Sequence, residues 1–148
     1  MPRQALASLL ALFLALASPL AWAETQLADP KPDWNNPRKL VLQLTDAAKA
    51  DGVLSNAVNV QKFYGQDNVK VAIVAYGNGV RALLKAESKV GERVKSLQSY
   101  DVEFVACGNT LETIKKTKAD LIPGVAVAPA GIPEIVERTL QGWTYIVP

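Results

Sequence analysis

The pattern that most constrains the fold of this chain is an alternation between short apolar runs and segments with helical spacing. The apolar runs cover residues 40–44, 69–75, 102–106, 125–128 and 143–147. Runs of this length are typical of strands buried on both faces, as in parallel sheets. Between them, apolar residues recur at helical spacing in 52–64, 80–85, 90–98, 111–116 and 132–140. Because strands alternate with helices, we expect an α/β fold, a three-layer α/β/α sandwich with a mostly parallel five-stranded sheet.

The first 23 residues have the pattern of a secretory signal peptide. They carry the basic residue Arg3 near their start, continue as an almost unbroken Ala/Leu run and end in small residues. We expect cleavage between Ala23 and Glu24, a periplasmic or secreted location, and no stable membrane insertion afterwards. The alternative is an uncleaved membrane anchor. Pro19 and the shortness of the apolar run argue against it.

Residues 24–37 read as an extended arm that precedes the folded domain. Three prolines lie among Asp, Asn and Lys residues, a composition that favours neither a helix nor a strand. The remaining residues, 38–148, are enough for one hydrophobic core and therefore predict a single domain.

The composition excludes several kinds of site. The chain has no His and one Cys, Cys107, so it lacks a His-based catalytic pair, an internal disulfide and a Cys-rich zinc site. We expect no metal and no cofactor. A formal net charge of +2 gives no reason to expect nucleic acid as a partner. Exported proteins tend to pair their cysteines or lack them. The unpaired thiol is therefore the first candidate for chemistry.

Cys107 closes the third predicted strand, just before a helix whose N-cap we expect at Asn109 or Thr110. Free N–H groups and the positive end of the helix dipole favour a thiolate there, and Gly108 leaves room for a bound atom. Three lysines downstream add positive potential: Lys115, Lys116 and Lys118. An accessible thiol with a lowered pKa would act as a nucleophile or accept sulfur. The residues leave an alternative open, in which Cys107 is a small apolar residue packed at a strand end.

Two further loops follow the carboxyl ends of predicted strands, where ligands bind in parallel α/β sheets. Gly77, Asn78 and Gly79 are a candidate anion-binding loop, or alternatively a plain turn from strand to helix. Asp46 is a candidate base or hydrogen-bonding group near the thiol, or alternatively a helix cap. The residues expected to support ligand binding around Cys107 are Asp46, Gly77, Asn78, Gly79, Gly108, Asn109 and Thr110.

Four segments together resemble a known family. They are Tyr76-Gly77-Asn78-Gly79, Phe104-Val105-Ala106-Cys107-Gly108-Asn109-Thr110, Leu121-Ile122-Pro123-Gly124-Val125 and Gly142-Trp143-Thr144-Tyr145-Ile146. They look like the DsrE/DsrF-like family, and more narrowly its exported single-domain branch. The resemblance covers about residues 38–148. It implies a three-layer domain around a parallel sheet, assembly into trimers or hexamers, and a cysteine that carries sulfur as a persulfide. Cys107 is the position that matches this family cysteine.

Three hypotheses about function follow. In the first, an exported protein uses Cys107 in a sulfur-carrier or sulfur-relay role, as a persulfide or thiolate site, with a sulfur-donor or acceptor protein as its partner. In the second, the chain is a non-catalytic module that binds a small ligand or forms an oligomer, and Cys107 only packs. In the third, it is a thiol redox protein whose resolving cysteine comes from a partner. The residues leave open whether the protein is an enzyme.

Overall fold

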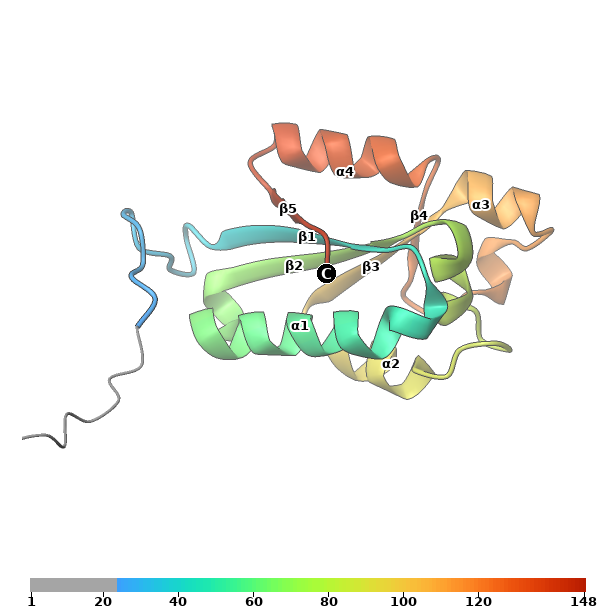
Figure 1. The fold of residues 1–148 in the computed structure, drawn as a ribbon, viewed down its shortest axis with the longest axis horizontal. Coiled ribbons are helices and arrows are strands. Elements are labelled where there is room, and N and C mark those ends of the chain that lie inside the picture. The colour runs from blue at the N-terminus through green and yellow to red at the C-terminus, as the bar shows by residue number, and fades with distance from the viewer. Residues whose placement is uncertain (1–23) are drawn as a thin grey trace, which may run out of the picture.

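The computed structural model describes residues 24–148 (Figure 1), so the predicted signal peptide lies outside the described residues. The strands are β1 (Arg38–Leu44), β2 (Val69–Ala75), β3 (Val102–Cys107), β4 (Ala126–Ala128) and β5 (Thr144–Ile146). The α-helices are α1 (Ala50–Tyr64), α2 (Gly91–Gln98), α3 (Gly108–Thr113) and α4 (Gly131–Leu140). Short 3₁₀ helices are η1 (Ala47–Lys49), η2 (Gln66–Asn68), η3 (Gly77–Leu83) and η4 (Lys118–Asp120). Within residues 24–148, no helix is long and apolar enough to span a bilayer.

The five strands form one sheet in the order β4-β3-β2-β1-β5. Every neighbouring pair is parallel, which confirms the predicted α/β class and makes the sheet wholly parallel. The three long strands β1, β2 and β3 lie in the centre, and the short strands β4 and β5 form the edges. All strands therefore place their carboxyl ends at the same edge of the sheet, which is where Cys107 lies.

Helices cover both faces of the sheet, which confirms the three-layer architecture. In Figure 1, α1 and α2 lie below the sheet, α4 lies above it, and α3 stands beyond the carboxyl ends of the strands. The face under α1 and α2 carries the larger core, which includes Leu42, Leu54, Ile73 and Phe104. The core on the face covered by α4 is smaller: Val41, Ala72, Val74, Val105, Ala128 and Ile135.

An ion-pair cluster holds α4 against the sheet. The Arg138 guanidinium contacts the Glu103 carboxylate on β3 at 2.8 Å and the Glu134 carboxylate at 2.8 Å. It also stacks on the Trp143 ring, 4.6 Å from the ring centroid. Because only 14% of the Arg138 side chain is exposed, this cluster is screened less than a surface pair. It therefore fixes the helix whose first residue, Gly131, lies beside Cys107.

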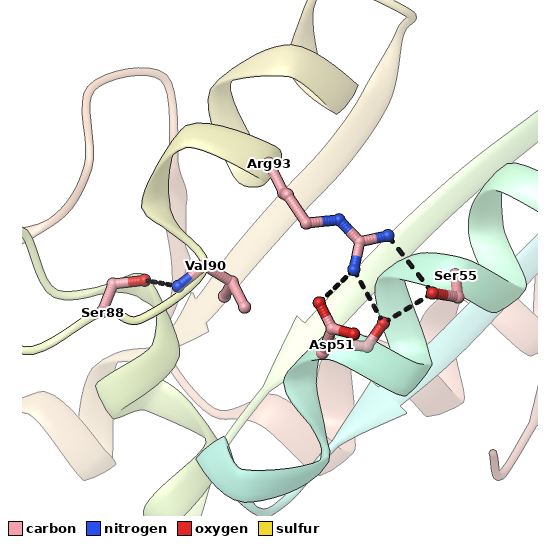
Figure 2. A network of polar contacts seen from close by, with 5 residues as sticks. All are labelled: Asp51, Ser55, Ser88, Val90 and Arg93. Carbon is pink, nitrogen blue, oxygen red and sulfur yellow. Dashed lines mark hydrogen bonds and ion pairs between the residues drawn. The ribbon is translucent and has the colours of Figure 1, made fainter.

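The predicted start of the first long helix was wrong. The apolar spacing predicted a start near residue 52, but α1 begins at Ala50 and follows directly on η1. Figure 2 shows that Asp51, in the first turn, contacts Arg93 of α2 through both its carboxylate and its carbonyl oxygen. Arg93 also reaches the Ser55 hydroxyl at 3.2 Å. These contacts join the two helices on the same side of the sheet. Gly65 ends α1 with a positive φ of 86°.

Two other helix predictions also need correction. The segment predicted as a helix at 80–85 is the 3₁₀ helix η3, which starts earlier, at Gly77. The helix predicted at 111–116 starts at Gly108, and its N-cap is Cys107 itself instead of Asn109 or Thr110. Both helices begin with a glycine at or just after the end of the strand: Gly77 has a positive φ of 55°, and Gly108 lets the backbone pass close to the end of β4.

The arm at residues 24–37 contains no helix or strand. The Arg38 guanidinium donates a hydrogen bond of 2.6 Å to the Ala28 carbonyl, which ties the arm to the start of β1. Trp34, in the same arm, is 74% exposed.

Candidate functional site

Cys107 lies where a strand and two helices meet. It is the last residue of β3 and the N-cap of α3, and the first residue of α4 packs against it. An alanine Cβ built at Gly131 would lie 3.3 Å from the Cys107 Cβ. Cys107 is only 5% exposed, whereas the sequence interpretation expected an accessible thiol. Its burial follows from the close packing of α4, which the sequence alone does not show.

Two opposing effects act on the pKa of the Cys107 thiol. Burial raises the pKa, but hydrogen-bond donors to the thiolate outweigh burial, and the pKa lies below its ordinary value. The donors are the Thr110 hydroxyl and the backbone N–H groups of Thr110, Gly131 and Asn109. Among the described residues, no cap hydrogen bond of standard geometry reaches the Cys107 side chain, so these groups act on it as nearby dipoles. The lysines predicted to contribute, at 115, 116 and 118, are not among the groups that lower this pKa.

Thr110 is oriented by the loop after β2. The Gly77 N–H donates to the Thr110 Oγ1 at 3.1 Å. Because a hydroxyl has one hydrogen and two lone pairs, this bond occupies a lone pair and leaves the hydrogen free to point at the sulfur. The predicted contribution of Gly77 to the thiol site is therefore indirect, through Thr110.

The Gly77-Asn78-Gly79 loop and Asp46 form a second set of contacts next to the first. The Asn78 Nδ2 donates to the Asp46 Oδ1 at 3.0 Å, and the same carboxylate oxygen caps η1 by accepting from the Ala48 N–H at 3.0 Å. Asp46 is thus a cap that also holds the loop. A Cβ at Gly79 would lie 2.0 Å from the Leu44 carbonyl oxygen, so this glycine permits a close backbone contact.

Gly108 plays a different part from the one predicted. A Cβ at this position would lie 3.1 Å from the carbonyl oxygens of both Ala128 and Pro129. The next N–H, of Asn109, donates to the Pro129 carbonyl at 3.1 Å. The backbone at Gly108 therefore approaches the end of β4 closely. This contact holds the loop before α4 against α3, and so keeps Gly131 beside the thiol.

Sequence reasoning assigned no role to three side chains near this edge of the sheet: Tyr76, Gln43 and Tyr145. Of these, Tyr76 is the neighbour of Cys107 on the adjacent strand. The phenol hydroxyls of Tyr76 and Tyr145 both contact the Gln43 Oε1, the first at 2.7 Å. Burial raises the pKa of Tyr76, and the nearby Tyr145 hydroxyl raises it further. The sequence held one indication of this cluster: Gln43 is the polar residue inside the otherwise apolar run 40–44.

A shallow groove of about 410 Å³ lies beside the thiol, between η3 and α3. Four predicted residues line it: Gly77, Asn78, Asn109 and Thr110. Cys107 does not line the groove. The structure thus gathers the predicted loops at one edge of the sheet but separates the groove from the sulfur.

Comparison with known proteins identifies the family. A family model described as the DsrE/DsrF-like family matches residues 31–148. The chain belongs to the DsrE/DsrF-like family. A search of curated proteins finds no match.

Two solved structures resemble this DsrE/DsrF-like chain. One is MTH1491 from Methanobacterium thermoautotrophicum, described as a protein of unknown function; it is 31% identical, with a TM-score of 0.71. The other is the ychN protein from E. coli, 16% identical with a TM-score of 0.64, a likeness that shows the fold alone. Each comparison covers 75% of this chain and 99% of the other chain.

Another cavity of the DsrE/DsrF-like domain lies at the opposite edge of the sheet. It measures about 860 Å³ and is lined by Trp34 of the arm and by the first residues of β2 and β3. The parallel strands place it away from the carboxyl edge, where ligands bind in folds of this class. Within residues 24–148, no three His, Cys, Asp or Glu side chains gather closely enough to hold a metal ion.

Proposed function

We propose that this protein is an exported sulfur carrier, in which Cys107 accepts sulfane sulfur and holds it as a persulfide. The observation that carries the proposal is the convergence of the Thr110 hydroxyl and the Gly131 and Asn109 N–H groups on one thiol, which lowers its pKa. The thiolate is the form that attacks sulfur, so a lowered pKa raises the reactive fraction near neutral pH. The signal-peptide pattern at residues 1–23 supports the exported location.

The proposed chemistry is an exchange between thiolates that needs no oxidant. The Cys107 thiolate attacks the terminal sulfur of a persulfide or polysulfide donor, a sulfur–sulfur bond forms, and the donor's own sulfur–sulfur bond breaks. The electron pair of the broken bond leaves with the donor thiolate. Transfer to an acceptor partner protein is the same reaction in reverse. The acceptor's thiolate attacks the outer sulfur of the persulfide, and Cys107 leaves as the thiolate. The donors around Cys107 stabilise the anion before and after each step.

The burial of Cys107 favours a second candidate function. With 5% of its surface exposed, the residue is packed as a core residue would be. In a non-catalytic binding or assembly module, the groove between η3 and α3 would hold the ligand and Cys107 would only pack. The two functions differ in whether the thiol reacts, and the following experiment separates them.

Treatment of the purified protein with inorganic polysulfide is expected to add one sulfur atom, about 32 Da, to Cys107. Intact-mass and peptide mass spectrometry would locate the adduct, and a reducing thiol should remove it. A Cys107→Ser variant should gain no mass. A wild-type thiol that titrates as free but takes up no sulfur would contradict the carrier function and favour the assembly module.

We also propose that the protein forms a homo-oligomer, a trimer or a hexamer. The outward face of α4 carries Ile132, Val136 and Leu140, which are 58%, 48% and 76% exposed. A spacing of four residues places these side chains in one stripe on the helix. Contiguous apolar side chains at the surface mark association sites.

Val136→Glu is expected to shift the protein from a trimer or hexamer to a monomer, because a carboxylate in the stripe would be desolvated on assembly. Size-exclusion chromatography with light scattering would measure the mass of each form. Glu137→Gln, on the same helix but outside the stripe, is the matched control and should leave the assembly unchanged. A monomeric wild-type protein, or an unchanged mass for Val136→Glu, would contradict the proposal.

A further inference from the structure

Tyr76 lies next to Cys107 at the carboxyl edge of the sheet, where α4 begins. In the register of β2 and β3, Ala75 pairs with Ala106, so the residues that follow them, Tyr76 and Cys107, are neighbours. Side chains alternate between the faces of a strand. Val74 and Val105, two residues earlier on each strand, pack in the core under α4. Cys107 belongs to the larger core, and Tyr76 packs against both cores, so the two residues lie side by side at the edge of the sheet where the cores meet.

Gly131 brings the two side chains together from above. A Cβ at Gly131 would lie 3.0 Å from the Tyr76 Cβ and 3.2 Å from its ring atom Cδ1, as well as 3.3 Å from the Cys107 Cβ. The first residue of α4 therefore touches the Tyr76 ring and the cysteine at once. Thr110 and Gly131 border the thiol, and the Tyr76 ring lies against Gly131 beside them.

Gly131, Thr110 and Tyr76 differ in how they are held in place around Cys107. The loop before Gly131 is fixed by the hydrogen bond from the Asn109 N–H to the Pro129 carbonyl, and Thr110 is fixed by the Gly77 N–H. The contact between Asn109 and Pro129 joins two backbone groups, so moving that border requires a loop to move, and the Thr110 side chain rotates only if it gives up the Gly77 N–H. The Tyr76 side chain, in contrast, moves by rotation about its own bonds, which in partly exposed residues is fast and inexpensive.

Gln43 holds the Tyr76 side chain from the neighbouring strand. The Tyr76 hydroxyl is 2.7 Å from the Gln43 Oε1, and the Tyr145 hydroxyl of the edge strand β5 contacts the same oxygen. A carbonyl oxygen has two lone pairs and accepts from both phenols. The hydroxyl of Tyr76 is thus tethered to β1, and the tether continues to Tyr145, which is 41% exposed at the sheet edge.

We propose that Tyr76 is a side-chain gate that controls access to Cys107, and that Gln43 and Tyr145 hold it closed. In the closed position the thiol is shielded from solvent. When the Tyr76–Gln43 hydrogen bond breaks, rotation of the ring opens a path from the face beside α4. The significance of the gate for sulfur transfer rests on the proposed carrier function, because the gate would decide which donors reach the thiolate. Its existence can be tested through thiol reactivity alone.

The test is the rate of Cys107 alkylation by iodoacetamide, measured across a range of pH. The midpoint of the profile reports the pKa of the thiol, and the plateau at high pH reports the accessibility of the thiolate. Tyr76→Phe keeps the ring and removes the hydroxyl. It should raise the plateau rate about fivefold, the factor that one net hydrogen bond contributes to an opening equilibrium. Gln43→Met, which removes the acceptor, should raise the plateau similarly. The midpoint should stay the same in both variants.

Tyr100→Phe is the matched control, because Tyr100 is an exposed tyrosine just after α2 and its hydroxyl can be removed far from the thiol. It should react as the wild type does. Unchanged plateau rates for Tyr76→Phe and Gln43→Met would overturn the gate, and so would a rate gain explained entirely by a shifted midpoint. The polysulfide experiment is independent: a faster Tyr76→Phe thiol without any sulfur adduct would refute the carrier function and leave the gate in place.

Discussion

Gly79→Ala is expected to lower the free energy of unfolding by about 3 kcal/mol, at the upper end for an overpacked site. The added methyl group would lie 2.0 Å from the Leu44 carbonyl oxygen and 2.5 Å from its carbon. Both are backbone atoms at the end of β1, so no side chain can move aside. The Gly79 N–H also donates to the Thr45 carbonyl at 2.9 Å, and a displaced loop would lose this bond. Denaturant unfolding followed by circular dichroism would measure the change.

Gly52→Ala is the matched control for this substitution. Gly52 lies in the first turn of α1, and a Cβ there would meet no atom within 4 Å. Because alanine favours a helix over glycine by about 0.8–1 kcal/mol, the control should stabilise the protein or leave it unchanged. If the two variants lost similar stability, the close contact between Gly79 and Leu44 would not explain the effect.

Thr110→Val is expected to slow the alkylation of Cys107 at neutral pH severalfold, because it removes the hydroxyl dipole that favours the thiolate. The Thr110 hydroxyl is the strongest of the groups that lower the pKa of Cys107, and valine has nearly the same shape without the donor. Removing it leaves burial, which raises the pKa, less opposed. The thiolate fraction at neutral pH then falls.

The sign of the effect is visible in the full pH profile. The wild-type midpoint should lie below that of a free cysteine, and the midpoint of Thr110→Val should lie above that of the wild type. At high pH, where both thiols are ionised, the two rates should converge. Thr113→Val is the control, because the Thr113 hydroxyl donates to the Asn109 carbonyl, on the same helix, at 2.8 Å. Equal midpoints for Thr110→Val and the wild type would show that burial and the backbone alone set the reactivity.

The candidate site was predicted in part. Cys107 and the loops at 77–79 and 108–110 were recognised because they follow apolar strands, and parallel strands place their carboxyl ends together. The roles within the site were less predictable. Thr110 acts on the thiol with both its hydroxyl and its N–H. Gly108 allows the close contact with the end of β4. These roles were not predicted because α3 starts earlier than its apolar spacing indicated.

The alternation of apolar runs with helical spacing was enough to determine the α/β class and the approximate positions of the strands, because that signal is local and repeats along the chain. The tertiary structure alone decided how buried Cys107 is and what surrounds it. Tyr76 and Gln43 are 33 residues apart, and Tyr145 and Gln43 are 102 apart. They meet only because β2 and β5 both pair with β1 in a particular register. Strand order and register depend on contacts across the whole domain, and a residue's own neighbours in sequence do not contain that information.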